Sequence, residues 1–249
     1  MPYRKLPRTD AARLRALKTV LENNELYTVR NRFVDWDTIN RAQPAYDRLL
    51  TAVEQYRVTY TAQLRSVGKA DRLQRNAVMY VSHFLQVLMM SVERGEIKKT
   101  ALRLYGLDDD ARTLPNIKSV GGLLKWGAMA VEGEKTRVRQ GGRPIYNPTI
   151  GMVGTHLDIF KDCYEQQKRL RERTSRALDA LREVRPEVDA VLLELWNQIE
   201  EHFKDEPLER RLDECRKLGV VYYYRKNEKI KNEELRIKRN RPIAYFLNS

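Results

Sequence analysis

The chain has 249 residues, of which 42% are hydrophobic and 33% are charged, so it is long enough to bury one large core or two smaller ones. The longest apolar stretch, residues 78–90, is interrupted by polar side chains, and the first residues lack the apolar segment of a signal peptide. We therefore expect no membrane span and a cytoplasmic location. The formal net charge of +13 suits a polyanionic partner, but it equally suits a solvated surface.

The first predicted element is a short amphipathic helix. Thr9 is suited to cap its N-terminus, and Asp10 lies favourably at the positive end of the helix dipole. Three leucines at helical spacing form an apolar stripe, and the pattern ends near residues 23–24. We expect residues 1–34 to form a basic N-terminal helix and a linker.

Two long helices are predicted next, over residues 37–67 and 69–93. In the first, apolar residues from Ile39 to Val67 recur at steps of three and four, which places them on one helix face. The second has a wider apolar face, which predicts packing on two neighbours. Because only Gly68 separates the two helices, we expect an antiparallel hairpin at this glycine.

A short helix over residues 98–105 is expected to end at Gly106, before an acidic loop. The third long helix, residues 120–140, contains several glycines. These weaken the helix, but they allow a neighbouring element to approach its backbone closely. It is expected to end at Gly141.

The last two long helices are predicted on either side of Pro186. Asn147 suits the N-cap of the first of them, and Pro148 suits its first helical position. Pro186 is expected to open the second, which continues to about residue 203.

The chain then turns from helical to extended. A short helix is predicted from Pro207 to Gly219, and Val220–Tyr224 is a β-prone run. A single strand leaves its backbone N–H and C=O groups without partners, so this run either pairs with a second extended segment or packs on helices as extended chain. Residues 225–249 are expected to form a basic C-terminal tail.

Together these elements predict an all-α fold: a four-long-helix bundle built from two similar helical hairpins, with short extra helices and one peripheral extended segment. The bundle covers residues 35–224, and a duplication with halves 35–118 and 119–224 accounts for a repeated pattern in it. In that pattern Phe84 corresponds to Trp196, and each precedes a short helix stopped by glycine. Chance is the alternative, because amphipathic helices resemble one another.

No motif for a metal, a nucleotide or a nucleophile is recognisable. A carboxylate-bridged di-metal site in a bundle requires Glu-x-x-His on two helices, and the residues at that spacing before the three histidines are Tyr80, Val153 and Ile199. The glycines at 68 and at 151–154 lack the other residues of a P-loop or a dinucleotide fingerprint. We therefore expect no metal, no cofactor and no enzyme activity.

The best candidate binding site is the loop that follows the third long helix. Backbone N–H groups of two glycines, a guanidinium and a helix N-terminus together suit a phosphate or a carboxylate. A well-made connection between two helices is the alternative, and we favour it. The candidate anion-binding residues are Gly141, Gly142, Arg143, Asn147 and, from the third helix, Lys125.

The basic residues gather at the two ends of the chain. Residues 1–32 hold eight Lys and Arg against three Asp and Glu, and residues 225–249 hold the same numbers, which leaves +3 for the whole middle. Such ends suit contacts with phosphates. The candidate nucleic-acid contacts are Arg4, Lys5, Arg8, Arg13, Arg15, Arg225, Lys226, Arg236, Lys238 and Arg239.

Two functions are compatible with these features. Nucleic-acid binding requires the two basic ends to share one surface. A protein-interaction or scaffold module would instead use exposed helix faces to bind an unknown protein partner or a second copy of the chain. We prefer the scaffold, because Asp and Glu interleave both basic ends and no nucleic-acid-binding motif is recognisable.

Several short segments also resemble those of a family of uncharacterised helical proteins from bacterial gut anaerobes. The similarity extends over about residues 3–226, and it implies a helical fold without implying an activity, a cofactor or a partner. The segments that carry it are Leu6–Lys18, Lys125–Gly127, Glu132–Glu134, Gly141–Ile150, Trp196–Glu201 and Gly219–Tyr222.

Overall fold

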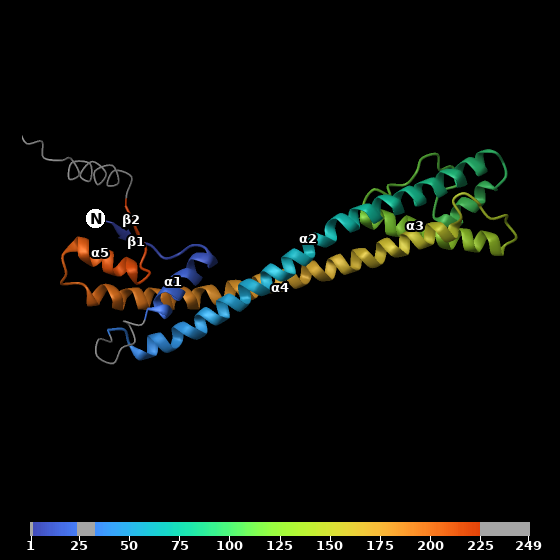
Figure 1. Cartoon of the computed structure of the whole chain (residues 1–249). Coiled ribbons are helices and arrows are strands. Elements are labelled where there is room, and N and C mark those ends of the chain that lie inside the picture. Colours follow the sequence, from blue (N-terminus) through green and yellow to red (C-terminus); the bar gives the residue numbers. More distant parts are fainter. Residues whose placement is uncertain (1, 24–32, 225–249) are drawn as a thin grey trace, which may run out of the picture. The chain divides into compact units, whose positions relative to one another are not determined.

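A computed structural model describes residues 2–23 and 33–224. In these residues the regular secondary structure is helical apart from one two-stranded sheet, which confirms the all-α prediction (Figure 1). The elements are β1 (Tyr3–Arg4), α1 (Asp10–Glu22), α2 (Trp36–Glu93), the 3-10 helix η2 (Lys99–Tyr105), α3 (Val120–Arg139), α4 (Ile150–His202), α5 (Leu208–Lys217) and β2 (Tyr222–Tyr223).

Two of these helices are far longer than predicted. α2 has 58 residues and passes through Gly68, and α4 has 53 residues and passes through Pro186, so the predicted hairpins at these positions are wrong. A glycine inside a helix costs only about 1 kcal/mol, which packing elsewhere along the helix offsets. Pro186 and Arg182, whose carbonyl loses its helical hydrogen bond, are both exposed, so water replaces that bond.

The chain is divided into two compact units, which we describe separately. Unit 1 consists of residues 1–56 and 177–249, and unit 2 consists of residues 57–176. This division differs from the predicted halves, because each long helix contributes one part to each unit. Unit 2 is therefore continuous in sequence and is inserted between the two parts of unit 1.

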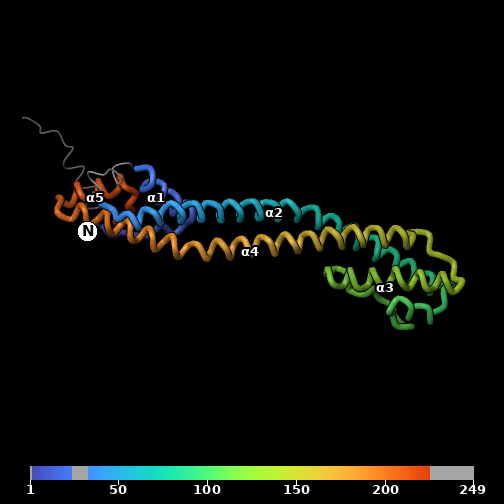
Figure 2. Tube along the Cα trace, turned by 90° about the horizontal axis from the view of Figure 1, so that it is seen from below, coloured from blue at the N-terminus to red at the C-terminus, as the bar shows by residue number. Residues whose placement is uncertain are grey.

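In unit 1, α1, the first part of α2, the last part of α4 and α5 enclose one apolar core (Figure 2). Its largest fully buried side chain is that of Trp196. The hydroxyl oxygen of Thr9 accepts a hydrogen bond from Ala12 N at 3.3 Å, which confirms the predicted cap of α1. β2 pairs antiparallel with β1, so the predicted strand has its second extended segment.

In unit 2, η2, α3, the last part of α2 and the first part of α4 share a second core. A Cβ added to Gly127 would lie 2.8 Å from the side chain of Leu157, and one added to Gly133 would lie 2.7 Å from the carbonyl oxygen of Leu104. The prediction that glycines let neighbours approach α3 closely is therefore confirmed.

The proposed internal repeat has a local counterpart in both units. η2 and α5 each follow a long helix, and each is followed by a glycine in the left-handed region, with φ of 70° at Gly106 and 87° at Gly219. Phe84 and Trp196, the predicted counterparts, are fully buried in the cores of unit 2 and unit 1 respectively. Superposition of the two stretches stays a prediction.

The apolar stripe predicted for α2 is only partly buried. Ile39 and Leu49 lie in the core of unit 1, whereas Leu64, in unit 2, is 54% exposed. In both views the beginning of the unit 2 part of α2 runs beside α4, with no third described helix over it (Figures 1 and 2). The stripe is therefore longer than the core that covers it.

Substitution of Gly68 by alanine should raise the free energy of unfolding by about 0.5–1 kcal/mol. Alanine is the better helix former, and an added Cβ would meet nothing within 4 Å. The matched control is Gly127→Ala, which should destabilise the protein because its Cβ would meet Leu157. Urea unfolding followed by circular dichroism measures both variants. A loss of stability in Gly68→Ala would contradict the continuous α2.

Candidate functional site

A buried polar network lies beside the loop in which the anion site was predicted. Glu134 and Arg137 are one turn apart on α3, and Tyr105 ends η2. Arg137 Nη2 donates to Glu134 Oε1 at 2.8 Å, and Arg137 Nε donates to the Tyr105 hydroxyl oxygen at 2.9 Å. The Tyr105 hydroxyl donates to Glu134 Oε2. None of the three residues is more than 7% exposed, so the network belongs to the core of unit 2.

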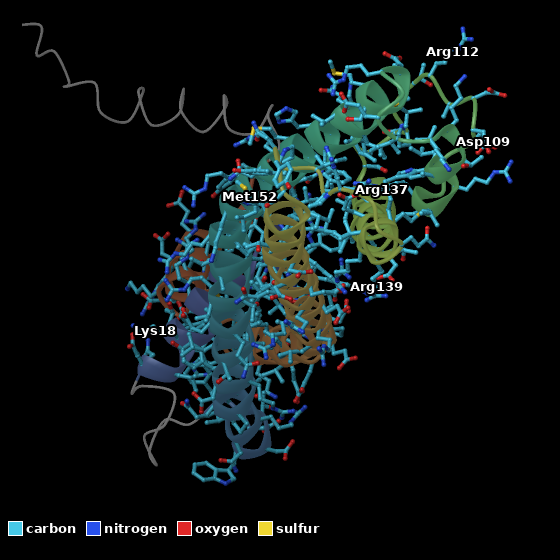
Figure 3. All side chains as sticks on the ribbon, turned by 90° about the vertical axis from the view of Figure 1, so that its right-hand side faces the viewer. Lys18, Asp109, Arg112, Arg137, Arg139 and Met152 are labelled. Atoms are coloured by element: carbon cyan, nitrogen blue, oxygen red, sulfur yellow. The ribbon has the colours of Figure 1, made fainter. Side chains whose placement is uncertain are left out.

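The same network holds the loop between α3 and α4. Glu134 Oε1 accepts from Ile145 N at 2.9 Å, and Arg137 Nη2 donates to the carbonyl oxygen of Arg143 at 2.7 Å. The Nε and Nη2 donors of Arg137 are therefore used inside the protein. Arg139, two residues further along α3, is exposed instead (Figure 3).

The charges of this network are compensated locally. Burial, the largest single effect, raises the pKa of Glu134, but hydrogen bonds from Arg137, Tyr105 and Ile145 N outweigh it and hold the pKa below its ordinary value. Burial, followed by the hydrogen bond to Glu134, raises the pKa of Tyr105, so the phenol keeps its proton and donates. A carboxylate satisfied in this way stabilises the fold and has no free lone pair directed to a ligand.

The residues predicted to bind an anion do not converge. Gly141, with φ of 89°, and Arg143 are both exposed in the loop. Lys125 lies in the first half of α3, roughly 20 Å along the helix axis from its C-terminal end, and therefore does not contribute to the loop. The connection between two helices, the interpretation that we favoured, describes this segment better.

Asn147 does not cap α4, contrary to the prediction. Tyr146 and Thr149 form an isolated β-bridge, which closes a turn over Asn147 and Pro148 before the helix begins at Ile150. The hydroxyl oxygen of Thr149 accepts from Met152 N at 3.3 Å and so satisfies an N-terminal donor of α4. Asn147 therefore lies outside α4 and does not join the N-terminus of this helix to the glycines of the loop.

Two of the basic residues predicted to contact nucleic acid are paired inside unit 1. Arg13 donates from Nε and Nη2 to the two carboxylate oxygens of Asp189, at 2.8 Å each, and is only 9% exposed. These hydrogen bonds are the largest cause of its raised pKa. Arg4 donates to Glu200 at 2.9 Å and to Asn197 at 2.7 Å. Both guanidinium groups attach the N-terminal segment to α4 and are not available to phosphates.

The sheet brings the two ends of the described chain together. Tyr3 lies opposite Tyr223, and Lys5 N donates to the carbonyl oxygen of Val221 at 3.3 Å. Arg8 and Arg15 are exposed nearby in sequence. The basic tail therefore begins at residue 225, two positions after the end of β2, the strand that pairs with β1. Its predicted contacts, Arg225, Lys226, Arg236, Lys238 and Arg239, lie outside the described residues.

The distribution of charge between the units differs from the predicted neutral middle. Unit 2 holds 22 Lys and Arg against 12 Asp and Glu, which accounts for +10 of the total of +13. Within it, residues 57–75 and 161–176 hold eleven Lys and Arg against four Asp and Glu. The count over residues 33–224 gave only +3, because this range also includes acidic parts of unit 1. A count over shorter windows of the sequence finds the positive charge of unit 2.

Other kinds of site have little support in the described part of the chain. In residues 2–23 and 33–224, no group of three or more His, Cys, Asp and Glu side chains is arranged to hold a metal ion. No helix within these ranges is both long and apolar enough to cross a membrane. An open pocket of about 440 Å³ in unit 2 is lined by Asp71, Gln74, Arg75, Val78, Met79 and Lys118.

No protein-family model, curated protein or solved structure matches the chain. The resemblance to helical bacterial proteins therefore stays a prediction.

Proposed function

We propose that the protein is a non-enzymatic nucleic-acid-binding protein whose two basic ends act together. The observation that supports this most directly is the pairing of β1 with β2. A shared surface of the two ends would favour nucleic acid over a scaffold, and this pairing supports the proposal because it joins residues next to both ends.

The contacts in this proposal come from both ends. Lys5, Arg8 and Arg15 supply the N-terminal contacts, and the tail adds eight Lys and Arg against three Asp and Glu. Arg4 and Arg13 act indirectly, since their ion pairs with Glu200 and Asp189 hold β1 and α1 on α4. Lys and Arg contacts of this kind neutralise phosphates and release counterions, so binding is salt-dependent and shows little sequence preference.

A fluorescence polarisation titration of a labelled duplex tests this proposal. With about five phosphate contacts, the logarithm of the affinity should fall with the logarithm of the salt concentration at a slope of about −4 to −5. Deletion of residues 225–249 removes a charge of +5 and should make the slope roughly half as steep. Measurements at ~50 and ~200 mM salt are sufficient. An unchanged slope after the deletion would contradict a role of the tail.

A scaffold or self-association module is the second candidate, with an unknown protein or another copy of the chain as partner. It is favoured by exposed apolar residues four positions apart on one face of α2, namely Tyr60 at 42% and Leu64 at 54% exposure. Apolar side chains close together on a solvent-exposed helix are typical of interaction surfaces. Absence of nucleic-acid binding at ~50 mM salt would remove the first candidate and leave this one.

A further inference from the structure

We propose that unit 2 carries a separate phosphate-binding surface, which recognises the backbone of double-helical nucleic acid. It is a basic stripe of α2 formed by Arg65, Lys69, Arg72 and Arg75. The inference deepens the proposed function by naming a duplex as the ligand. It uses none of the residues at the chain ends, so the two proposals are tested by different variants.

The spacing of the stripe places its charges together. Arg65, Lys69 and Arg72 follow one another at steps of four and three residues, which keeps them on one helix face, and Arg75 is a turn further along. All four residues are exposed. Asp71 is the one acidic residue between positions 57 and 75. The stripe therefore presents positive charge to solvent over about 15 Å of helix.

These four residues differ from exposed arginines of unit 1 such as Arg41 and Arg48 in having no acidic partner. Arg41 pairs with Asp37 and Glu194, and Arg48 pairs with Glu187. Within the described residues, no carboxylate lies within ion-pair distance of the stripe. Its charges are thus solvated and free to contact an anion.

The stripe also weakens the helix on which it lies. Like charges four residues apart cost a helix about 0.2–0.5 kcal/mol, and Arg65 and Lys69 have this spacing. Gly68, another unfavourable helix residue, lies between them with open space where a side chain would be. A polyanion along the stripe would reduce both costs, because it neutralises the charges and can approach the backbone at the glycine.

Neighbouring elements add positive charge to the same part of unit 2. Arg75 and Lys118 line the pocket of about 440 Å³, and Gln74 Nε2 donates to the carbonyl oxygen of Lys118 at 3.3 Å. Residues 161–176 of α4, which runs beside α2 in both views, contribute six Lys and Arg against three Asp and Glu (Figures 1 and 2). The local potential thus favours an anion larger than a single phosphate.

The side chains around the stripe favour a duplex over a single strand or a membrane. Single-strand sites combine basic residues with exposed aromatic rings for stacking. From Arg65 to Arg75 no residue is aromatic, and the nearest exposed ring is that of Tyr60, five positions before the stripe, at 42% exposure. In residues 161–176 the one aromatic residue is Tyr164, which is half-buried and packs near Phe160. Membrane-surface helices need a broad exposed apolar face beside the charges. Here the exposed residues from Arg65 to Arg75 are charged or glycine, and the exposed apolar residues Leu64 and Met79 lie at either end of the stripe instead of forming a face beside it.

The test compares two triple variants that change the charge by the same amount. The first is Arg65→Gln, Lys69→Gln and Arg72→Gln. The matched control is Lys98→Gln, Lys99→Gln and Arg112→Gln, which replaces exposed residues of the same unit outside the stripe. Circular dichroism establishes that both variants keep the helical fold. Full-length proteins are titrated with a labelled 30-base-pair duplex at ~50 and ~200 mM salt.

Three stripe contacts added to about five at the chain ends give the unmodified protein a slope of about −7. The stripe variant should flatten this slope by about three, since each lost phosphate contact removes about 0.9. The loss of affinity between the two salt concentrations then becomes about 40-fold smaller. The control variant should keep the slope of the unmodified protein. Equal changes in both variants would show that only net charge matters and would overturn the inference.

Two further results separate this inference from the proposal on the chain ends. If deletion of residues 225–249 leaves the slope unchanged while the stripe variant flattens it, the proposal on the ends fails and the stripe stands. If the deletion flattens the slope while the stripe variant leaves it unchanged, the inference about the stripe fails and the proposal on the ends stands. Binding of the protein to vesicles of phosphatidylserine and phosphatidylcholine without binding to the duplex would overturn the choice of partner.

Discussion

Glu134→Ala should lower the free energy of unfolding by about 3–5 kcal/mol. The substitution leaves the guanidinium of Arg137 buried without its charged partner, and an unpaired buried charge costs this much. It also removes the acceptor of Ile145 N, which holds the loop before α4. Urea denaturation followed by circular dichroism measures the change. A variant as stable as the unmodified protein would contradict the buried network.

Two controls identify the origin of this loss. The double variant Glu134→Leu with Arg137→Leu removes both charges, and it should cost less than the single change because no charge is left unpaired. Since the pKa of Glu134 is depressed, its contribution is fully present above the ordinary glutamate pKa of 4.5 and is lost as the pH falls below it. The difference in stability between the unmodified protein and Glu134→Gln should therefore shrink at acid pH.

Trp196→Ala should destabilise unit 1 by about 3–5 kcal/mol. Its side chain is the largest that is fully buried, so truncation removes apolar contact area and leaves a cavity in the core. Thermal unfolding of the variant measures the loss. A decrease of less than about 1 kcal/mol would mean that unit 1 has no tightly packed core at this position.

Trp196→Phe is the informative control for this variant. Among the described residues, the indole N–H of Trp196 has no hydrogen-bond partner, and a buried donor without an acceptor is unfavourable. Phenylalanine removes that donor while it keeps an aromatic ring in the core. It should therefore recover a large part of the stability that alanine loses.

Local sequence signals predicted where helices lie better than where they end. The hydroxyl cap at Thr9 and the left-handed glycines at 106 and 219 are confirmed, because each depends on a few neighbouring residues. Gly68 and Pro186 were read as ends by the same local reasoning. That reading was wrong, because packing and solvation along a long helix outweigh one unfavourable residue.

The candidate sites depended on relations that local patterns do not contain. The loop at Gly141 has suitable residues for an anion, but the hydroxyl that accepts from Arg137 belongs to Tyr105, 32 positions earlier, and follows from how η2 packs on α3. The pairing of Arg13 with Asp189 joins residues 176 positions apart, and no helical periodicity predicts it. The basic stripe, in contrast, was visible in the sequence as a run with a single acidic residue.

The insertion of unit 2 between the two parts of unit 1 determines the order in which the protein can fold during synthesis. Unit 2 is continuous and can fold as soon as it has left the ribosome. α1 and the first part of α2 must wait for residues such as Asp189, 176 positions after Arg13, and Glu194, 153 positions after Arg41, a delay on the order of ten seconds. During that interval the apolar face of α1, with Leu17 and Val20, has no core to enter. The core of unit 1 is complete only when α4, α5 and the segment up to β2 have also been synthesised.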